Sequence, residues 1–169
     1  MPTLYIMCGQ AFSGKSTLAK EIAKYANATL VSQDAIWFEK EEEAKHSGQM
    51  PDYHAVLEIS KQKIREALKQ GKSAVFDNTN AGFNHREEFR QIASECGAEA
   101  VVVYLNTSDV ELNKRQEINR VTKERHEVNE EEIQKVRDRF ETPTSNENVI
   151  VYLPNENVSG WLKKSIKLS

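Results

Sequence analysis

Short apolar runs alternate along this chain with segments whose apolar residues recur at helical spacing. Runs of strand length occur at residues 3–8, 28–32, 73–77, 100–105 and 149–153. The segment from Thr17 to Ala26 has apolar residues on one helical face, as an amphipathic helix requires. The run at 100–105 is apolar without alternation, which is typical of a strand covered on both faces. Repeated strand–helix units predict an α/β fold, in which helices cover both faces of a parallel sheet.

Further helices are expected in the spaces between these strands. They cover residues 54–70, 84–96, 109 to about 120, a segment starting at Asn129, and a short C-terminal segment. Residues 35–52 are less regular and predict a short helix followed by an exposed loop. This excursion is either a place where an acceptor binds or a solvated surface segment, and the pattern does not decide between them.

The first strand leads into a phosphate-binding motif. Residues 9–16 read G-Q-A-F-S-G-K-S, the pattern G-x-x-x-x-G-K-S, and the first helix follows at once. The glycines let backbone N–H groups curl around a phosphate, and the helix dipole points at the same anion. Lys15 is expected to reach the β- and γ-phosphates, and the Ser16 hydroxyl to bind Mg²⁺. The predicted nucleotide-binding residues are Gly9, Gln10, Ala11, Phe12, Ser13, Gly14, Lys15, Ser16 and Thr17.

Two acidic residues follow predicted strands, at the sheet edge where ligands bind in open α/β sheets. Asp34 comes just after the second strand, where a carboxylate could accept a proton from an attacking hydroxyl; alternatively, it caps a helix beginning at Ala35. Asp77 ends the third strand and is predicted to hold Mg²⁺. A capping turn is the alternative for Asp77, but the next helix is expected to start later, near Asn84, with Glu87 at capping-box spacing.

A polar segment late in the chain carries arginines and predicts a lid over residues 113–130. Arg115, Arg120 and Arg125 recur where apolar residues are few. Cations of this kind can surround a transferring phosphoryl group and exclude water. Charge pattern alone favours a solvated helix face. The phosphate-binding loop reverses that preference, because a bound γ-phosphate has to be covered.

Composition narrows the possibilities further. The 169 residues suit one domain, 1–169, with 38% hydrophobic and 29% charged residues and a net charge of −3. No general positive field indicates a nucleic-acid partner, and no apolar run reaches membrane-spanning length. Cys8 and Cys96 fall on apolar faces and predict buried thiols rather than a disulfide or a metal pair. We expect a cytoplasmic protein without a membrane or an obligate protein partner.

Four stretches together resemble the small P-loop kinases related to polynucleotide 5′-hydroxyl kinase, a group that includes seryl-tRNA kinase relatives. They are GQAFSGKS, VSQDAI, VFDNTNAGFNHR, and the segment from Lys114 through ERHEVNEEEI to RFETP. The resemblance implies a P-loop NTPase three-layer α/β/α sandwich with a five-stranded parallel sheet in the order 2-3-1-4-5 and an Arg-bearing helical lid. It also implies ATP as the phosphoryl donor and Mg²⁺ as the cofactor.

The resemblance also assigns roles to residues. Lys15, Asp34, Arg120 and Arg125 would be catalytic, with Asp34 as the general base and the two arginines in the lid; Ser16 and Asp77 would hold the metal. The acceptor side would comprise Asp34, Trp37, Asp77, Thr79, Asn80 and Arg86. The chain departs from the family at Trp37, where relatives often carry an arginine that holds the acceptor's phosphate. An aromatic ring can stack on a base or sugar but cannot bind a phosphate.

The sequence therefore predicts an ATP- and Mg²⁺-dependent kinase that phosphorylates a hydroxyl group. Its acceptor would be a nucleic-acid 5′ end, a nucleoside or another small molecule. The alternative is a P-loop ATPase or nucleotide-binding switch that hydrolyses ATP without an acceptor. An acid after the second strand argues against the switch, which needs no acceptor base, and no N-K-x-D motif for reading guanine occurs.

Overall fold

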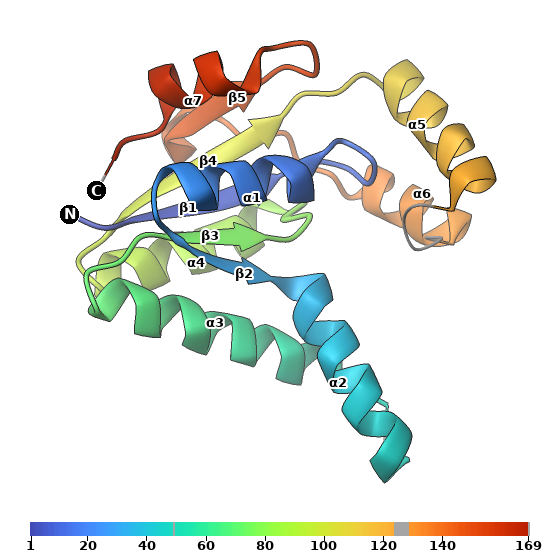
Figure 1. The fold of residues 1–169 in the computed structure, drawn as a ribbon, viewed down its shortest axis with the longest axis horizontal. Helices are drawn as coiled ribbons and strands as arrows, with labels where there is room; N and C mark the ends of the chain where they lie inside the picture. The colour runs from blue at the N-terminus through green and yellow to red at the C-terminus, as the bar shows by residue number, and fades with distance from the viewer. Residues whose placement is uncertain (49, 124–128, 169) are drawn as a thin grey trace.

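A parallel sheet of five strands forms the centre of the protein, whose computed structural model describes residues 1–48, 50–123 and 129–168 (Figure 1). In spatial order the strands are β2 (Thr29–Ser32), β3 (Ala74–Asp77), β1 (Thr3–Cys8), β4 (Glu99–Leu105) and β5 (Val149–Tyr152). Each neighbouring pair is parallel. The order 2-3-1-4-5 and the α/β class are both confirmed.

The central strand β1 shows why both faces of the sheet are covered. Its side chains alternate between two apolar clusters, with Leu4, Ile6 and Cys8 in one and Tyr5 and Met7 in the other. Every residue of the strand is buried, as expected for a strand with helices on both sides. The first cluster includes residues of α3 (Tyr53–Lys69) and α4 (Phe83–Glu95), and the second includes residues of α1 (Lys15–Tyr25) and α7 (Val158–Ser165).

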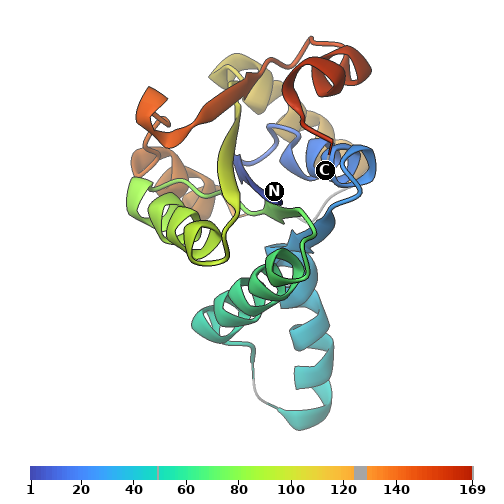
Figure 2. The same cartoon turned by 90° about the vertical axis from the view of Figure 1, so that its left-hand side faces the viewer.

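The remaining helices lie beyond the carboxyl ends of the strands, where the candidate site is found (Figure 1). They are α2 (Gln33–Ser47), α5 (Asp109–Thr122) and α6 (Glu130–Asp138). A 3₁₀ turn, η1 (Ser145–Glu147), precedes the amino end of β5. Figure 2 shows α2 extending away from the body of the protein beside α3. In open α/β sheets, ligands bind beyond the carboxyl ends of the strands. The connections that leave this edge of the sheet are therefore the ones expected to carry functional residues.

The prediction of a short helix and loop for residues 35–52 is wrong in length. Helix α2 runs from Gln33 to Ser47 and takes in the acidic segment, which is held by the surface ion pairs Lys40–Glu43 and Lys45–Glu42. Its N-cap is Ser32, whose hydroxyl accepts a hydrogen bond from the Ala35 N–H. Asp34 therefore lies in the first turn and is not the capping residue.

The expected start of α4 near Asn84 is confirmed to within one residue, but the capping box expected with Glu87 is not formed. The helix begins at Phe83, Gly82 is its N-cap, and Glu141, far along the chain, accepts a hydrogen bond from the Phe83 N–H. Local capping rules cannot find such a distant partner.

Both cysteines are free thiols. Cys8 is buried, whereas Cys96 is only partly so. Within the described ranges, no helix combines the length and apolar composition needed to span a bilayer.

Candidate active site

The loop between β1 and α1 has the backbone of an anion cradle. Gly14, the N-cap of α1, has φ 96°, in the left-handed region that favours glycine. Gly9 is crowded, because a Cβ there would lie 2.9 Å from Ser13 Oγ and 3.3 Å from Leu105 Cβ. No described side chain caps α1, so the N–H groups of its first turn remain suited to an anion.

Two predicted metal residues meet beside this loop. Asp77, at the end of β3, is 7% exposed and lies beside Ser16, the second residue of α1, whose hydroxyl favours the charged carboxylate. Burial raises the pKa of Asp77, and this outweighs the opposing effects of Ser16 and the nearby positive charge of Lys15. The Lys15 ammonium donates to the carbonyl oxygen of Gln10 at 2.7 Å, so it lies over the loop that it is predicted to serve.

These residues fit Mg²⁺ bound together with a nucleotide. Hydroxyl and carboxylate oxygens are the ligands that Mg²⁺ prefers, and it is usually held by one or two carboxylates plus substrate phosphates and water. A partly desolvated carboxylate whose pKa is raised by burial gains from a nearby cation. Among the described residues, no group of three or more His, Cys, Asp or Glu could hold a metal ion by itself. A bound Mg²⁺ would therefore take its remaining ligands from the nucleotide phosphates and water.

A cavity of about 720 Å³ joins the loop to the other candidate residues. Asp34 enters it from the first turn of α2, with Phe38 one helical turn further on. Asp34 is exposed to solvent, and Ser32↔Asp77 is the last register pair between β2 and β3, so both acids emerge at the same edge. The cavity is lined by residues of the loop and α1 (Ala11, Phe12, Lys15, Ser16, Thr17, Lys20), α2 (Asp34, Phe38), the end of β3 (Asp77, Asn78, Thr79), and α6 and its C-cap (Glu132, Ile133, Lys135, Val136, Arg139).

Three of the residues predicted on the acceptor side do not line this cavity. Trp37 is partly buried against the apolar cluster of α3 and α4, and its neighbour Phe38 faces the cavity instead. Asn80 is buried and donates to the Met7 carbonyl oxygen at 2.6 Å. Arg86 has no exposed surface and forms an ion pair with Glu147. Asn80 and Arg86 are thus buried in the interior, and Trp37 packs against the apolar cluster, so none of the three reaches the cavity lining.

Of the three arginines predicted for a lid, the two that lie among the described residues occupy different places. Arg120 is exposed on α5, pairs with Glu117 and Glu130, and does not line either of the cavities described here. Arg125 lies outside the described residues. Arg115 donates to the carbonyl oxygens of Phe12 at 3.3 Å and Ser13 at 3.2 Å, so it contacts the outer side of the phosphate-binding loop.

Two cavity cations on α6 and its C-cap were missed by the sequence reasoning, in addition to Lys20 on α1. Lys135 and Arg139 line the cavity from α6 and its C-cap, and neither forms an ion pair with another described residue. Their spacing of four residues places them on one side of the helix, which was a usable signal. The arginines of the preceding segment obscured this signal, because the local sequence pattern does not show which helix directs its basic side chains into the cavity.

A second cavity, of about 370 Å³, also borders the loop. It combines loop residues with α5 and the connection between β5 and α7, and much of its lining is apolar or planar. Those residues are Phe12, Ser13, Gly14, Thr17, Leu18, Glu21, Arg115, Ile118, Asn119, Thr122, Tyr152, Pro154 and Val158. The sequence reasoning did not identify this cavity, since its walls come from segments far apart in the chain.

Solved structures with this fold are numerous and distant in sequence. A putative kinase from Chloroflexus aurantiacus J-10-fl aligns with a TM-score of 0.73 at 16% identity, over 98% of this chain and 99% of that chain. A gluconokinase from Sinorhizobium meliloti 1021 aligns at 0.67 and 18%, over 96% and 89%. Chaetomium thermophilum Kti12 in complex with ADP-AlF3 aligns at 0.73 and 13%, over 95% and 96%. At these identities the likeness establishes the fold.

The sequence comparisons give one family. A search among curated proteins finds no significant match. A family model described as an AAA domain matches residues 4–143, which include the phosphate-binding loop, both acids and the segment predicted to be a lid. Because this model spans most of the chain and the sheet has the strand order of P-loop kinases, the protein belongs to the AAA domain family AAA_33 and has a P-loop kinase-like fold.

Proposed function

We propose that this protein is an ATP- and Mg²⁺-dependent kinase that transfers the γ-phosphoryl group to a hydroxyl of its acceptor. The observation that supports this most strongly is the cavity of about 720 Å³ that contains both the phosphate-binding loop and Asp34. A nucleotide switch needs no base for an acceptor hydroxyl, whereas a transferase of this kind needs one near the γ-phosphate. Distant structural neighbours named as kinases are consistent with the same reaction class.

On the donor side, the loop amides and Lys15 hold the phosphates. Lys15 would leave the Gln10 carbonyl oxygen, its partner at 2.7 Å, for the β- and γ-phosphates. Ser16 and Asp77 would hold Mg²⁺, which neutralises charge on the phosphate oxygens when it is bound. The nucleoside part of ATP would occupy the second cavity, where the aliphatic and planar side chains of Leu18, Tyr152 and Pro154 offer apolar contact.

On the acceptor side, Asp34 would act as the general base. Its carboxylate would accept the proton of the acceptor hydroxyl as the new O–P bond forms and the bond to the ADP leaving group breaks. Ser32 already caps α2, so the Asp34 carboxylate is not required for that purpose. Phe38 would pack against the acceptor one turn away.

Cations are needed around the transferring group. Arg120 and Arg125 are the candidates from the sequence, and Lys135 and Arg139 are the candidates from the cavity. The second pair has the better position, since both side chains line the cavity in the described arrangement and Arg120 is engaged by Glu117 and Glu130.

We favour a polynucleotide-kinase-like reaction on a small acceptor or on the end of a larger one. The net charge of −3 and the partly buried Trp37, which stands where relatives often carry a phosphate-binding arginine, both argue against a long basic track for nucleic acid. The named activity of the gluconokinase neighbour makes sugars a further class to test.

The proposal is tested by a transfer screen with γ-labelled ATP and Mg²⁺ against 5′-hydroxyl oligonucleotides, tRNA, nucleosides and sugars. Label is expected on one acceptor class, and Lys15→Ala should abolish it. Lys24→Ala, an exposed lysine at the far end of the same helix, serves as the matched control and should keep full activity. Release of label only to water would favour the ATPase alternative, and full activity in Lys15→Ala would contradict the assignment of the loop.

A further inference from the structure

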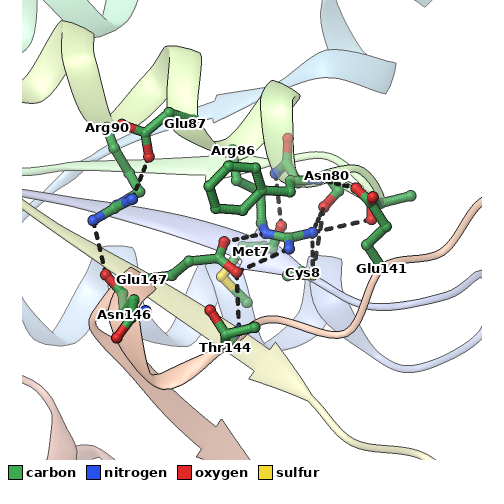
Figure 3. Close-up of polar contacts among 12 residues, drawn as sticks. Met7, Cys8, Asn80, Arg86, Glu87, Arg90, Glu141, Thr144, Asn146 and Glu147 are labelled. Atoms are coloured by element: carbon green, nitrogen blue, oxygen red, sulfur yellow. Dashed lines mark hydrogen bonds and ion pairs between the residues drawn. The ribbon is translucent and has the colours of Figure 1, made fainter.

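A buried ion pair lies directly behind the candidate site. Arg86 on α4 and Glu147 in η1 have side chains that are 0% and 1% exposed. Arg86 Nε donates to Glu147 Oε2 at 2.6 Å and Nη2 donates to Oε1 at 3.1 Å, so the contact is bidentate (Figure 3). Glu147 also accepts from the Thr144 N–H at 2.9 Å. The site assignments above leave this pair without a role.

The third nitrogen of the guanidinium holds the loop after β3. Arg86 Nη1 donates to the carbonyl oxygens of Asn80 and Ala81, both at 3.0 Å. This loop carries Thr79, which lines the cavity and whose carbonyl oxygen accepts from the N–H of Gly9 at 3.3 Å. Arg86 therefore supports the cavity wall from behind, and the same loop touches the first residue of the phosphate-binding motif.

The same loop is bonded to the segment that follows α6. The Glu141 N–H donates to the Ala81 carbonyl oxygen at 2.9 Å, and the Glu141 carboxylate accepts from the Phe83 N–H. Ala81 O thus receives hydrogen bonds from both Arg86 and Glu141. Glu141 is two residues beyond Arg139, which lines the cavity. The segment that follows α6 and the loop after β3 are therefore joined at the Ala81 carbonyl group.

A buried charge pair is an unexpected choice if stability is all that is required. The desolvation of two charges offsets much of their attraction, and apolar side chains of similar volume often give equal stability. What apolar side chains cannot supply is a set of directed hydrogen bonds to Asn80 O, Ala81 O and the η1 segment at once. The planar guanidinium, with its donors in a fixed fork, can supply them.

We propose that Arg86 and Glu147 are positioning residues for phosphoryl transfer. They fix the positions of the loop that carries Thr79 and of the segment that follows α6, relative to the phosphate-binding loop. The proposal rests on the kinase function proposed above. It predicts that losing the pair lowers kcat while the nucleotide still binds, because the cavity walls move relative to a loop that is otherwise intact.

The decisive variant is R86M/E147L, in which both charges are replaced by apolar groups of similar volume. If the pair positions the site, this variant should fold and bind ATP normally, but its kcat should fall by on the order of tenfold or more. R86K is the second variant, because a lysine can keep the charge pair but not the fork, and an intermediate kcat is expected. The control is R90M, one turn along α4, which loses the surface contacts of Arg90 with Glu87 and Asn146 O and should leave kcat unchanged.

A structural readout separates this proposal from the kinase assignment. Amide hydrogen exchange at Gly9 and Glu141 reports the bonds to Thr79 O and Ala81 O, whether or not any substrate is known. Protection at both amides should fall in R86M/E147L and in R86K, but not in R90M. Wild-type protection in both Arg86 variants, or a wild-type kcat in R86M/E147L, would overturn the positioning role. If the wild-type protein transfers no phosphoryl group, the kinase function fails, and the exchange result still decides whether the pair positions these segments.

Discussion

Replacing Glu147 by alanine should destabilise this protein far more than any surface ion-pair change. The substitution removes the carboxylate that accepts hydrogen bonds from Arg86 Nε, Arg86 Nη2 and the Thr144 N–H. The guanidinium then stays in a position with 0% exposure, where water cannot replace the lost partner. The penalty therefore comes mainly from the uncompensated charge of Arg86 and less from the loss of attraction itself.

The expected magnitude follows from that burial. Removing one partner of a buried ion pair typically costs about 3–5 kcal/mol, whereas an exposed pair contributes about 0–1 kcal/mol. For a domain of this size, each kcal/mol shifts the melting midpoint by roughly 2–4 °C, so Glu147→Ala should lower it by about 6–20 °C. Glu87→Ala, which breaks the more exposed pair with Arg90 on the same helix, should lower it by no more than about 4 °C.

The effect should also depend on pH. Burial alone would raise the pKa of Glu147, but the hydrogen bonds from Arg86 and Thr144 outweigh it and hold the pKa below its usual value. The stabilisation is therefore complete above the unfolded-state pKa and is lost as the pH falls through the lower folded-state value. The difference between wild type and Glu147→Ala should narrow below about pH 4.

Thermal and urea unfolding, followed by circular dichroism between pH 3 and pH 8, measure these differences. A loss below about 1 kcal/mol at pH 7 is what an exposed pair would show. That result would refute the reasoning, and so would a difference that grows on acidification. A large loss in Glu147→Ala together with near-wild-type stability in the double apolar variant is the combination expected of a buried, uncompensated charge.

Three further outcomes are expected at the candidate site. Asp34→Asn should retain ATP binding, measured by calorimetry, but lose transfer by on the order of a hundredfold; equal turnover would exclude a general base. Arg139→Ala should lower kcat more than Arg120→Ala in steady-state assays, because only Arg139 lines the cavity; the reverse order would assign the phosphoryl contact to α5. Asp77→Asn should raise the melting midpoint without ligand, since burial disfavours the Asp77 charge, and should reduce the gain from Mg-ATP in differential scanning fluorimetry; an undiminished gain would remove Asp77 from the metal site.

Most of the secondary structure could be derived from local patterns. The strand runs and Gly9–Ser16 occur as predicted, because apolar periodicity and the loop motif are properties of neighbouring residues. The alternative role of Asp34 as the N-cap of α2 does not hold, because a neighbouring residue takes that position. Ser32 and Asp34 both suit an N-cap, and only the backbone of Ser32 places a hydroxyl within reach of the Ala35 N–H.

The candidate site was predictable in part, for a related reason. Lys15, Ser16, Asp34 and Asp77 follow strands whose carboxyl ends share one edge, so topology alone brings them into one cavity. Arg86 was different, because its predicted place on the acceptor side came from its position in a motif. The stretch that contains it also forms α4, and helical geometry turns Arg86 inward to the core.

By itself, the sequence determined the strand–helix order, the phosphate-binding loop and the acids at the strand ends, since each depends on residues within a few positions of one another. Only the tertiary structure decided which cations face the cavity and where Arg86 finds its partner. Glu147 is separated from Arg86 by 61 residues, and Glu141 from Phe83 by 58. Contacts over such separations depend on how α4, α6 and the return to β5 pack together, and no local pattern of polarity or charge encodes that packing.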